Sequence, residues 1–197
     1  MITYPDEAHI LIRLLAEDQA EWGSTGGTDQ QQTVRRRALQ RADTMLQILG
    51  NISEPTLSAL GSEAAQAMSI LATHASLSAT HTVLDAFTKC YVIDPENTYY
   101  QAIPALTDWV LILERMPQRF GTIWLYDQYK YPYLPTVESF EHLYARRRQY
   151  GIGPLHWPKS LTISLSGQPW LKKPLSELVM RTPTDQDYQE LAADYLI

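Results

Sequence analysis

Residues 61–75, GSEAAQAMSILATHA, carry the pattern that decides the fold class. Ala64, Met68 and Leu71 recur at steps of four and three residues, which is the spacing of one helix face. The Gly-Ser-Glu opening supplies a polar start and an acidic residue where the helix dipole favours negative charge. This stretch therefore predicts a strong helix with an apolar side turned into a core.

The same helical spacing recurs on both sides of this stretch. A glycine-rich loop at residues 23–28 separates the first two predicted helices, and Asp94-Pro95 breaks the chain further on. The sequence predicts helices over residues 6–22, 29–49, 61–75, from Ser78 or Thr80 to about 91, 96–116, 136–150 and 184–197.

Two segments do not follow the helical pattern. Residues 121–133 are aromatic and β-branched, which is typical of a short irregular hairpin or a long ordered loop. Residues 154–183 are rich in proline and predict an extended strap, with residues 161–165 as a possible edge strand. We therefore expect a mainly α fold, with residues 1–197 as a single-domain bundle of six or seven helices plus an aromatic insert and this strap.

Length and charge narrow the functional classes. The chain has 197 residues and a net charge of −6, so one domain is expected and a general nucleic-acid binder is disfavoured. A single cysteine excludes an internal disulfide and favours a reducing compartment. The N-terminus lacks signal-peptide features and no apolar stretch approaches the ~20 residues that span a bilayer. The sequence thus predicts a cytoplasmic protein with no membrane association.

Tyrosine is unusually frequent, with 12 Tyr against 3 Phe, and nine of the twelve lie between residues 91 and 150. A buried tyrosine must also satisfy its hydroxyl, so bulk alone does not explain this excess. Part of it fits helical core positions. The rest falls in the aromatic insert, which we expect to form a lid beside a site or a partner interface, through Trp124, Tyr126, Tyr129, Tyr131 and Tyr133.

His74 and Asp108 are the candidate catalytic residues. His74 lies on the apolar side of its helix, which is consistent with a hydrogen-bonded core histidine or with a general acid or base in a pocket. Asp108 interrupts an apolar helix, so it either faces solvent or is a buried carboxylate that orients His74 or pairs with an arginine.

Several polar residues could hold a ligand or fill ordinary structural roles. Gln118, Arg119 and Thr122 offer an amide, a guanidinium and a hydroxyl within five residues, although such residues also form common turns. The arginines at 146–148 lie near a helix C-terminus, where cations complement the dipole. Together with the cluster at residues 35–41, they also leave RNA or phosphate binding open as a further alternative.

An ordered set of short motifs resembles a bacterial protein-domain family of unknown function. That family has Asp-Gln early, Gln-His-Ala on a middle helix, Leu-x-Asp-Arg, Gln-x-Tyr-Gly-Thr-Gln and finally Arg-Arg-x-x-x-Gly-Leu. The resemblance covers about residues 10–157, and Thr73, Trp109 and Ile123 depart from the pattern. It implies no established reaction, only a set of candidate site residues: Asp18, Gln19, His74, Asp108, Gln118, Thr122 and Arg147.

Two functions remain open at this point. The first is a small enzyme without a cofactor that acts on a polar or anionic small molecule, with His74 as acid or base. Its substrate would be held by Gln118, Arg119, Thr122, Arg147, Asp18 and Gln19. The second is a non-catalytic protein of the immunity or accessory type, which binds a protein partner through the aromatic insert. No Cys/His set has metal-ligand spacing, so no metal is expected.

Overall fold

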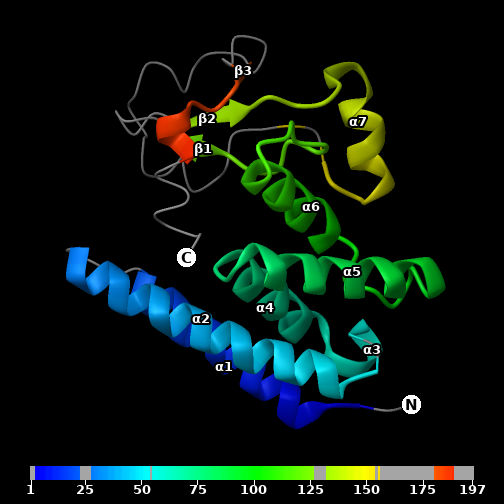
Figure 1. The fold of residues 1–197 in the computed structure, drawn as a ribbon. Coiled ribbons are helices and arrows are strands. Elements are labelled where there is room, and N and C mark those ends of the chain that lie inside the picture. The colour runs from blue at the N-terminus through cyan, green and yellow to red at the C-terminus, as the bar shows by residue number, and fades with distance from the viewer. Residues whose placement is uncertain are drawn as a thin grey trace, which may run out of the picture.

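Helix α4, Ser62–Thr73, lies at the centre of the helical part of the molecule (Figure 1). The computed structural model describes residues 3–22, 28–53, 55–126, 132–153, 155 and 180–188. Within these residues the predicted fold class is confirmed: the chain is a mainly α single domain, and six of its helices have seven residues or more. The helices are α1 (Pro5–Trp22), α2 (Thr28–Asn51), α3 (Leu57–Leu60), α4, α5 (Leu77–Ile93), α6 (Ala102–Leu113) and α7 (Phe140–Gln149).

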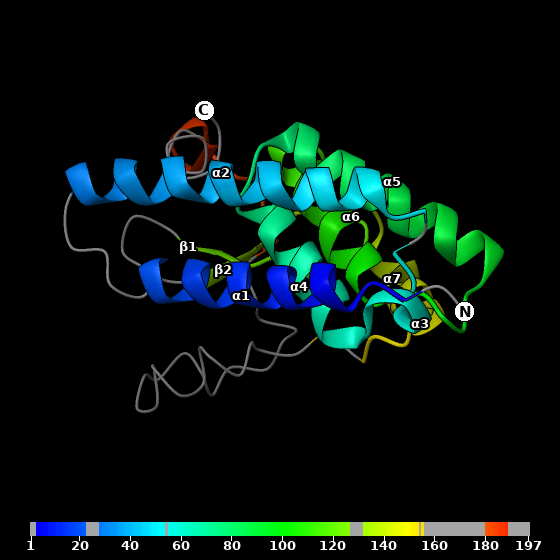
Figure 2. The same cartoon turned by 90° about the horizontal axis from the view of Figure 1, so that it is seen from below.

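The helices α1 and α2 run side by side, and α4 packs against both of them (Figure 2). Small residues make this possible, because Ala64, Ala65 and Ala67 on α4 are fully buried and let neighbouring helices approach closely. Larger side chains from α1, α2, α5 and α6 complete one contiguous core around them, including Leu11, Met45, Phe87 and Leu106.

Capping residues explain where several helices begin. The Thr56 hydroxyl accepts a hydrogen bond from the Ala59 amide at the start of α3, and the Ser76 side chain does the same for Ala79 in α5. The sequence predicted one helix from residue 96, but α6 begins at Ala102. Pro104 accordingly lies in the first turn of α6, where its missing amide proton is not needed.

The aromatic insert begins as a hairpin, in agreement with one of the two predicted forms. Strand β1 (Leu125–Tyr126) pairs antiparallel with β2 (Pro132–Pro135), and β3 (Met180–Arg181) adds to β2 in parallel. The strand order is therefore β1-β2-β3. A second small core lies beside this sheet and under α7, formed by Leu134, Val137, Leu143 and Leu155.

The C-terminal region is described only in part. Residues 185–188 are helical, and they begin with the predicted cap: the Thr184 amide donates to the Asp187 carboxylate, and the Asp187 amide donates to the Thr184 hydroxyl. Most of the predicted strap, its strand at residues 161–165 and the rest of the final helix lie outside the described residues. No helix in the described part of the chain is long and apolar enough to cross a membrane.

Candidate functional site

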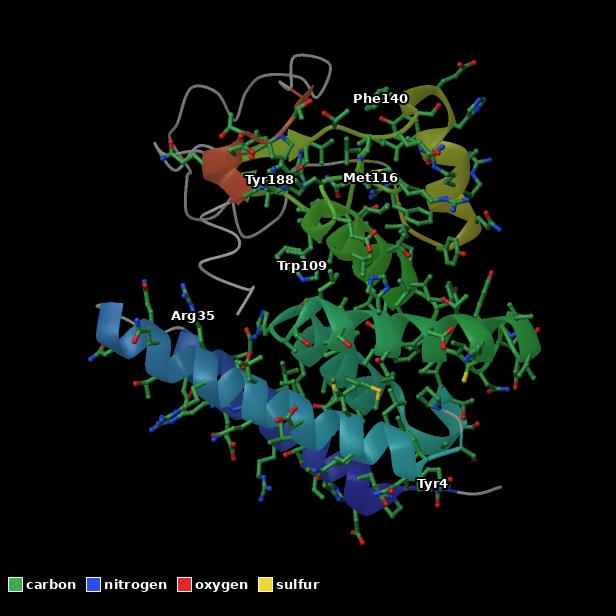
Figure 3. All side chains as sticks on the ribbon, viewed as in Figure 1. Tyr4, Arg35, Trp109, Met116, Phe140 and Tyr188 are labelled. Carbon is green, nitrogen blue, oxygen red and sulfur yellow. The ribbon has the colours of Figure 1, made fainter. Side chains whose placement is uncertain are left out.

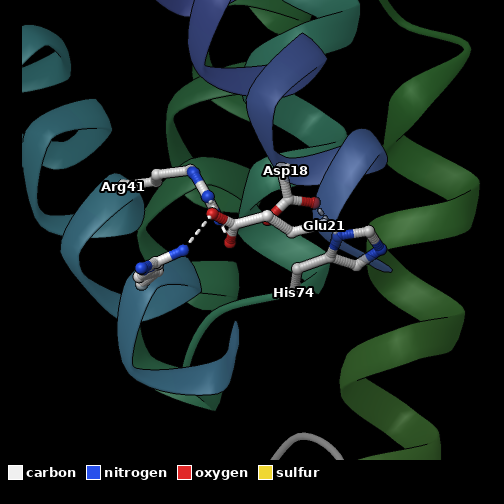
Figure 4. Close-up of polar contacts among 5 residues, drawn as sticks. Asp18, Glu21, Arg41 and His74 are labelled. Atoms are coloured by element: carbon white, nitrogen blue, oxygen red, sulfur yellow. Dashed lines mark hydrogen bonds and ion pairs between the residues drawn. The ribbon is translucent and has the colours of Figure 1, made fainter. Parts of the chain in front are cut away.

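Asp18 and His74, which are far apart in the sequence, meet between α1 and α4 (Figure 4). Asp18 lies in the last turns of α1, and His74 directly follows the last residue of α4. The Nδ1 atom of His74 is 2.6 Å from the Oδ2 atom of Asp18. The Asp18 side chain is 0% exposed and the His74 side chain is 21% exposed, so a buried carboxylate holds an imidazole that reaches the surface.

The contact sets the tautomer of the imidazole. An ionised carboxylate can only accept hydrogen bonds, so the proton between the two residues resides on Nδ1 of His74. A neutral ring then carries its lone pair on Nε2, which is the atom that can take a proton from another group. A buried aspartate that orients a histidine in this way is the arrangement of catalytic triads, in which the imidazole acts as a general base.

Arg41 on α2 supplies the charge that Asp18 needs. Its Nη1 atom donates to Oδ1 of Asp18 over 3.2 Å, and its Nη2 atom contacts Oε2 of Glu21. The Arg41 side chain is itself nearly buried. A carboxylate taken out of water is strongly destabilised unless it is paired, so Arg41 is what permits the full burial of Asp18.

Glu21 and Arg37 extend this group of charges. Arg37 donates from Nη1 to Oε1 of Glu21 over 2.8 Å. Burial raises the pKa of Glu21, but hydrogen bonds from Arg41 and Arg37 lower it by more, so its pKa lies below the ordinary value. We call these five residues, Asp18, Glu21, Arg37, Arg41 and His74, the Asp18 network. With both acids ionised and a neutral imidazole, the network carries no net charge.

The Asp18 network follows from the register of the α1–α2 hairpin. The two helices are antiparallel, so Glu21 on α1 faces Arg37 on α2, and Asp18, one turn earlier on α1, faces Arg41, one turn later on α2. From the sequence these arginines were expected to be part of a cluster for RNA or phosphate, whereas in the structure Arg37 and Arg41 pair with acids of the preceding helix. Asp18 and Glu21 lie three residues apart on α1, and Arg37 and Arg41 lie four apart on α2, so each pair shares one helix face. Acids and arginines at helical spacing on two successive helices were the signal that could have predicted the pairing.

Asp108 does not contact His74, contrary to the predicted pairing. Its Oδ1 atom accepts from the amides of Arg119 and Phe120, and its Oδ2 atom accepts from the amide and hydroxyl of Thr122, over 2.7–2.9 Å. Of the two positions that the sequence left open for Asp108, solvent-facing or buried, the structure shows the buried one. Burial raises the pKa of Asp108 above its ordinary value although all four hydrogen bonds oppose this effect. The carboxylate organises the turn at residues 119–122.

Gln118 and Arg147 are engaged in holding the same turn. The Gln118 side chain exchanges two hydrogen bonds with the backbone of Ile123, at 2.9 and 3.0 Å. Arg147 donates to the carbonyls of Phe120 and Gly153, each over 2.7 Å. Burial lowers the pKa of Arg147, while the charge of Asp108 opposes that shift. These contacts are internal, and we do not include the two residues in the proposed substrate site.

The other predicted site residues are scattered. Gln19 and Arg119 are exposed, and Thr122 belongs to the turn held by Asp108. In the aromatic insert Trp124 is half-buried and Tyr133 is buried. The side chain of Tyr126, and all of Tyr129 and Tyr131, lie outside the described residues.

The structure thus brings together two of the predicted candidates, Asp18 and His74. It adds Glu21, which was not predicted, and Arg37 and Arg41, which were expected only in the arginine cluster. Among the described residues no group of three or more His, Cys, Asp or Glu side chains is placed to hold a metal ion. Comparisons of the chain with protein-family models, curated proteins and solved structures found no match. The geometry of the Asp18 network is therefore the observation from which a function can be inferred.

Proposed function

We propose that the protein is a small enzyme that acts on a polar or anionic small molecule, with His74 as the general base. One observation carries this proposal: the 2.6 Å contact between Nδ1 of His74 and the fully buried carboxylate of Asp18. This contact favours the tautomer that places the basic lone pair on Nε2, on a side chain that reaches the surface.

The burial of charge at this point supports a role beyond packing. An ion pair buried between helices is often no more stabilising than apolar side chains of the same volume. Here Asp18 and Arg41 are both buried at the junction of three elements, and their arrangement fixes the orientation of one partly exposed histidine. Rigid support of this kind is what a general base requires.

The family resemblance gives separate support. Asp18 belongs to its Asp-Gln motif and His74 to its His-Ala motif, which are 56 residues apart in the chain. The two side chains that the resemblance selected from these motifs are in direct contact. Asp108, from a third motif, supports the fold of the turn instead.

A panel of small polar and anionic metabolites, screened for turnover, tests the proposal. His74→Ala should reduce turnover by about 10²–10⁴-fold, the usual contribution of a general base. Asp18→Asn should reduce it by about 10²-fold or more, because it removes the acceptor that orients the ring. Circular dichroism and thermal unfolding establish that each variant is folded before its activity is measured.

His81→Ala is the matched control. His81 also contacts a carboxylate, with 3.1 Å between its Nε2 atom and Oε1 of Glu114, but both of these side chains are exposed. Its replacement should leave turnover unchanged. Full activity of a folded His74→Ala variant would remove His74 from the mechanism and overturn the proposal.

The described structure gives less support to the two alternatives. Tyr133 in the aromatic insert is buried, so it is not exposed to contact a protein partner. In the arginine clusters, the guanidinium groups of Arg37, Arg41 and Arg147 already contact carboxylates or backbone carbonyls, which weakens the case for RNA binding there.

A further inference from the structure

A cavity of about 540 Å³ lies at the C-terminal end of α7. Figure 1 shows α7 well away from the paired helices α1 and α2. Among the described residues the lining of the cavity includes Tyr144, Arg148, Gly151, Ile152 and Gly153, and we call it the Arg148 cavity. A volume of this size falls within the range of small-molecule sites in proteins. No described lining residue belongs to the Asp18 network, and Figure 3 shows Phe140 on α7 far from Arg35 on α2, so the helix that carries Arg148 lies away from the helix that carries Arg41.

The three consecutive arginines at the end of α7 have different roles. Arg146 donates to the carbonyls of Arg119 and Ser139, and Arg147 is buried on the carbonyls of the 119–122 turn. The Arg148 side chain is exposed and makes no hydrogen bond or ion pair with any residue that the structure describes. Two of the three guanidinium groups are therefore structural, and the third is available to an anion in the cavity.

Exposed aromatic rings lie on the same face of α7. Phe140, Tyr144 and Arg148 follow one another at four-residue steps, so they form one stripe along the helix. The rings of Phe140 and Tyr144 pack edge to face with centroids 6.2 Å apart, yet these side chains are 42% and 44% exposed. Large aromatic surface left in water beside an arginine is typical of recognition sites.

The backbone on the other side of the cavity is fixed in place. Gly151 has a φ of +62°, and a Cβ atom there would lie 3.3 Å from the hydroxyl of Tyr100. The amides of Gly151 and Ile152 donate to the carbonyls of Arg148 and Arg147. Because these two amides are already engaged, the guanidinium of Arg148 is the cationic donor that the described part of the lining offers to a ligand.

We propose that the Arg148 cavity binds a small molecule that carries an anionic group on a flat apolar ring. The guanidinium of Arg148 pairs with the carboxylate or phosphate, and the exposed face of Tyr144 packs against the ring. This site is independent of the proposed chemistry at His74.

Binding is measured by isothermal titration calorimetry and by NMR shifts, with four probes. Phenyl phosphate and benzoate carry both features, inorganic phosphate carries only the anion, and benzyl alcohol carries only the ring. Phenyl phosphate or benzoate should bind at least about tenfold more tightly than the two single-feature probes, since both contacts contribute. The stronger of the two aromatic anions identifies whether the site prefers phosphate or carboxylate.

Variants then locate the site. Arg148→Ala should weaken binding of the preferred probe by about tenfold or more, and Arg148→Lys by less, because lysine keeps the charge without the bidentate geometry. Tyr144→Ala should weaken the aromatic anions but not inorganic phosphate. Arg36→Ala, an exposed arginine on α2, and His74→Ala should leave binding unchanged.

Three results would overturn the proposal. One is that none of the probes binds at millimolar concentration. Another is that Arg148→Ala binds as the unmodified protein does. The third is that inorganic phosphate binds as tightly as phenyl phosphate and benzoate, which would leave no role for the ring.

Discussion

Replacing Asp108 with asparagine measures how strongly one buried carboxylate holds the 119–122 turn. Asp108 accepts four hydrogen bonds, two on each oxygen. Asparagine keeps one oxygen, which can still accept from Arg119 and Phe120, but it places an amide group opposite Thr122. The Thr122 hydroxyl can rotate and accept, whereas the Thr122 amide is left facing another donor.

The magnitude follows from these contacts. One buried amide without an acceptor costs about 1–3 kcal/mol. The two bonds that remain lose the carboxylate charge, which costs roughly 1 kcal/mol each, since charge-assisted bonds are about twice as strong as neutral ones. Removing a buried charge, which burial already disfavours in Asp108, offsets part of this loss. We therefore expect a decrease of about 2–4 kcal/mol in the free energy of unfolding.

Urea and thermal unfolding followed by circular dichroism measure this decrease. For a chain of this size it corresponds to a Tm lowered by about 4–15 °C. Asp43→Asn is the matched control, since Asp43 is exposed on α2, and its effect should stay within about 0.5 kcal/mol. An Asp108→Asn variant as stable as that control would refute the assignment of Asp108 to the turn.

Three further predictions concern stability. The pKa of Asp108 is raised in the native state, so at pH values between the unfolded and the native pKa the native protein holds a proton that the unfolded chain has released. The free energy of unfolding should therefore fall as pH rises through that range. Titrations of unfolding against pH should show that Asp108→Asn lacks this component. Arg41→Ala should lower the free energy of unfolding by about 3–5 kcal/mol, because it leaves the buried Asp18 carboxylate unpaired. Arg36→Ala should change it by about 0.5 kcal/mol or less in the same urea assay. Equal effects of the two variants would contradict the pairing. Gly121→Ala should lower the free energy of unfolding by about 1–2 kcal/mol, because φ of Gly121 is +63°. Gly153→Ala should be tolerated, since φ there is not positive and a Cβ would meet nothing within 4 Å. A Tm of Gly121→Ala no lower than that of Gly153→Ala would contradict this expectation.

The helices were predictable because apolar periodicity and caps are local signals. Residues 61–75 predicted α4 closely, and the predicted break at Asp94-Pro95 falls at the end of α5. The start of α6 was predicted too early, since aromatic residues before Ala102 continue the apolar spacing although Pro104 favours a helix that begins just before it.

The site was only partly predictable, since its contacts join distant parts of the chain. The resemblance selected Asp18 and His74, but the expected partner of His74 was Asp108. The partners of Asp108 are mainly backbone amides of a later turn. Nearly every residue type has a backbone amide, so the sequence does not indicate which amides a carboxylate will bind. The pairing of Arg41 with Asp18 could have been predicted from charge spacing, because the acids on α1 and the arginines on α2 each recur at helical intervals.

The tautomer of His74 tests the central claim most directly, because it requires no knowledge of the substrate. Long-range ¹H–¹⁵N correlation spectra report which ring nitrogen carries the proton, at a pH where the imidazole is neutral. We expect the proton of His74 on Nδ1, and a shift toward Nε2 in Asp18→Asn, with no change at His81 in the same variant. A His74 ring protonated on Nε2 in the unmodified protein, or one whose tautomer does not respond to Asp18→Asn, would contradict the claim that Asp18 prepares His74 as a base.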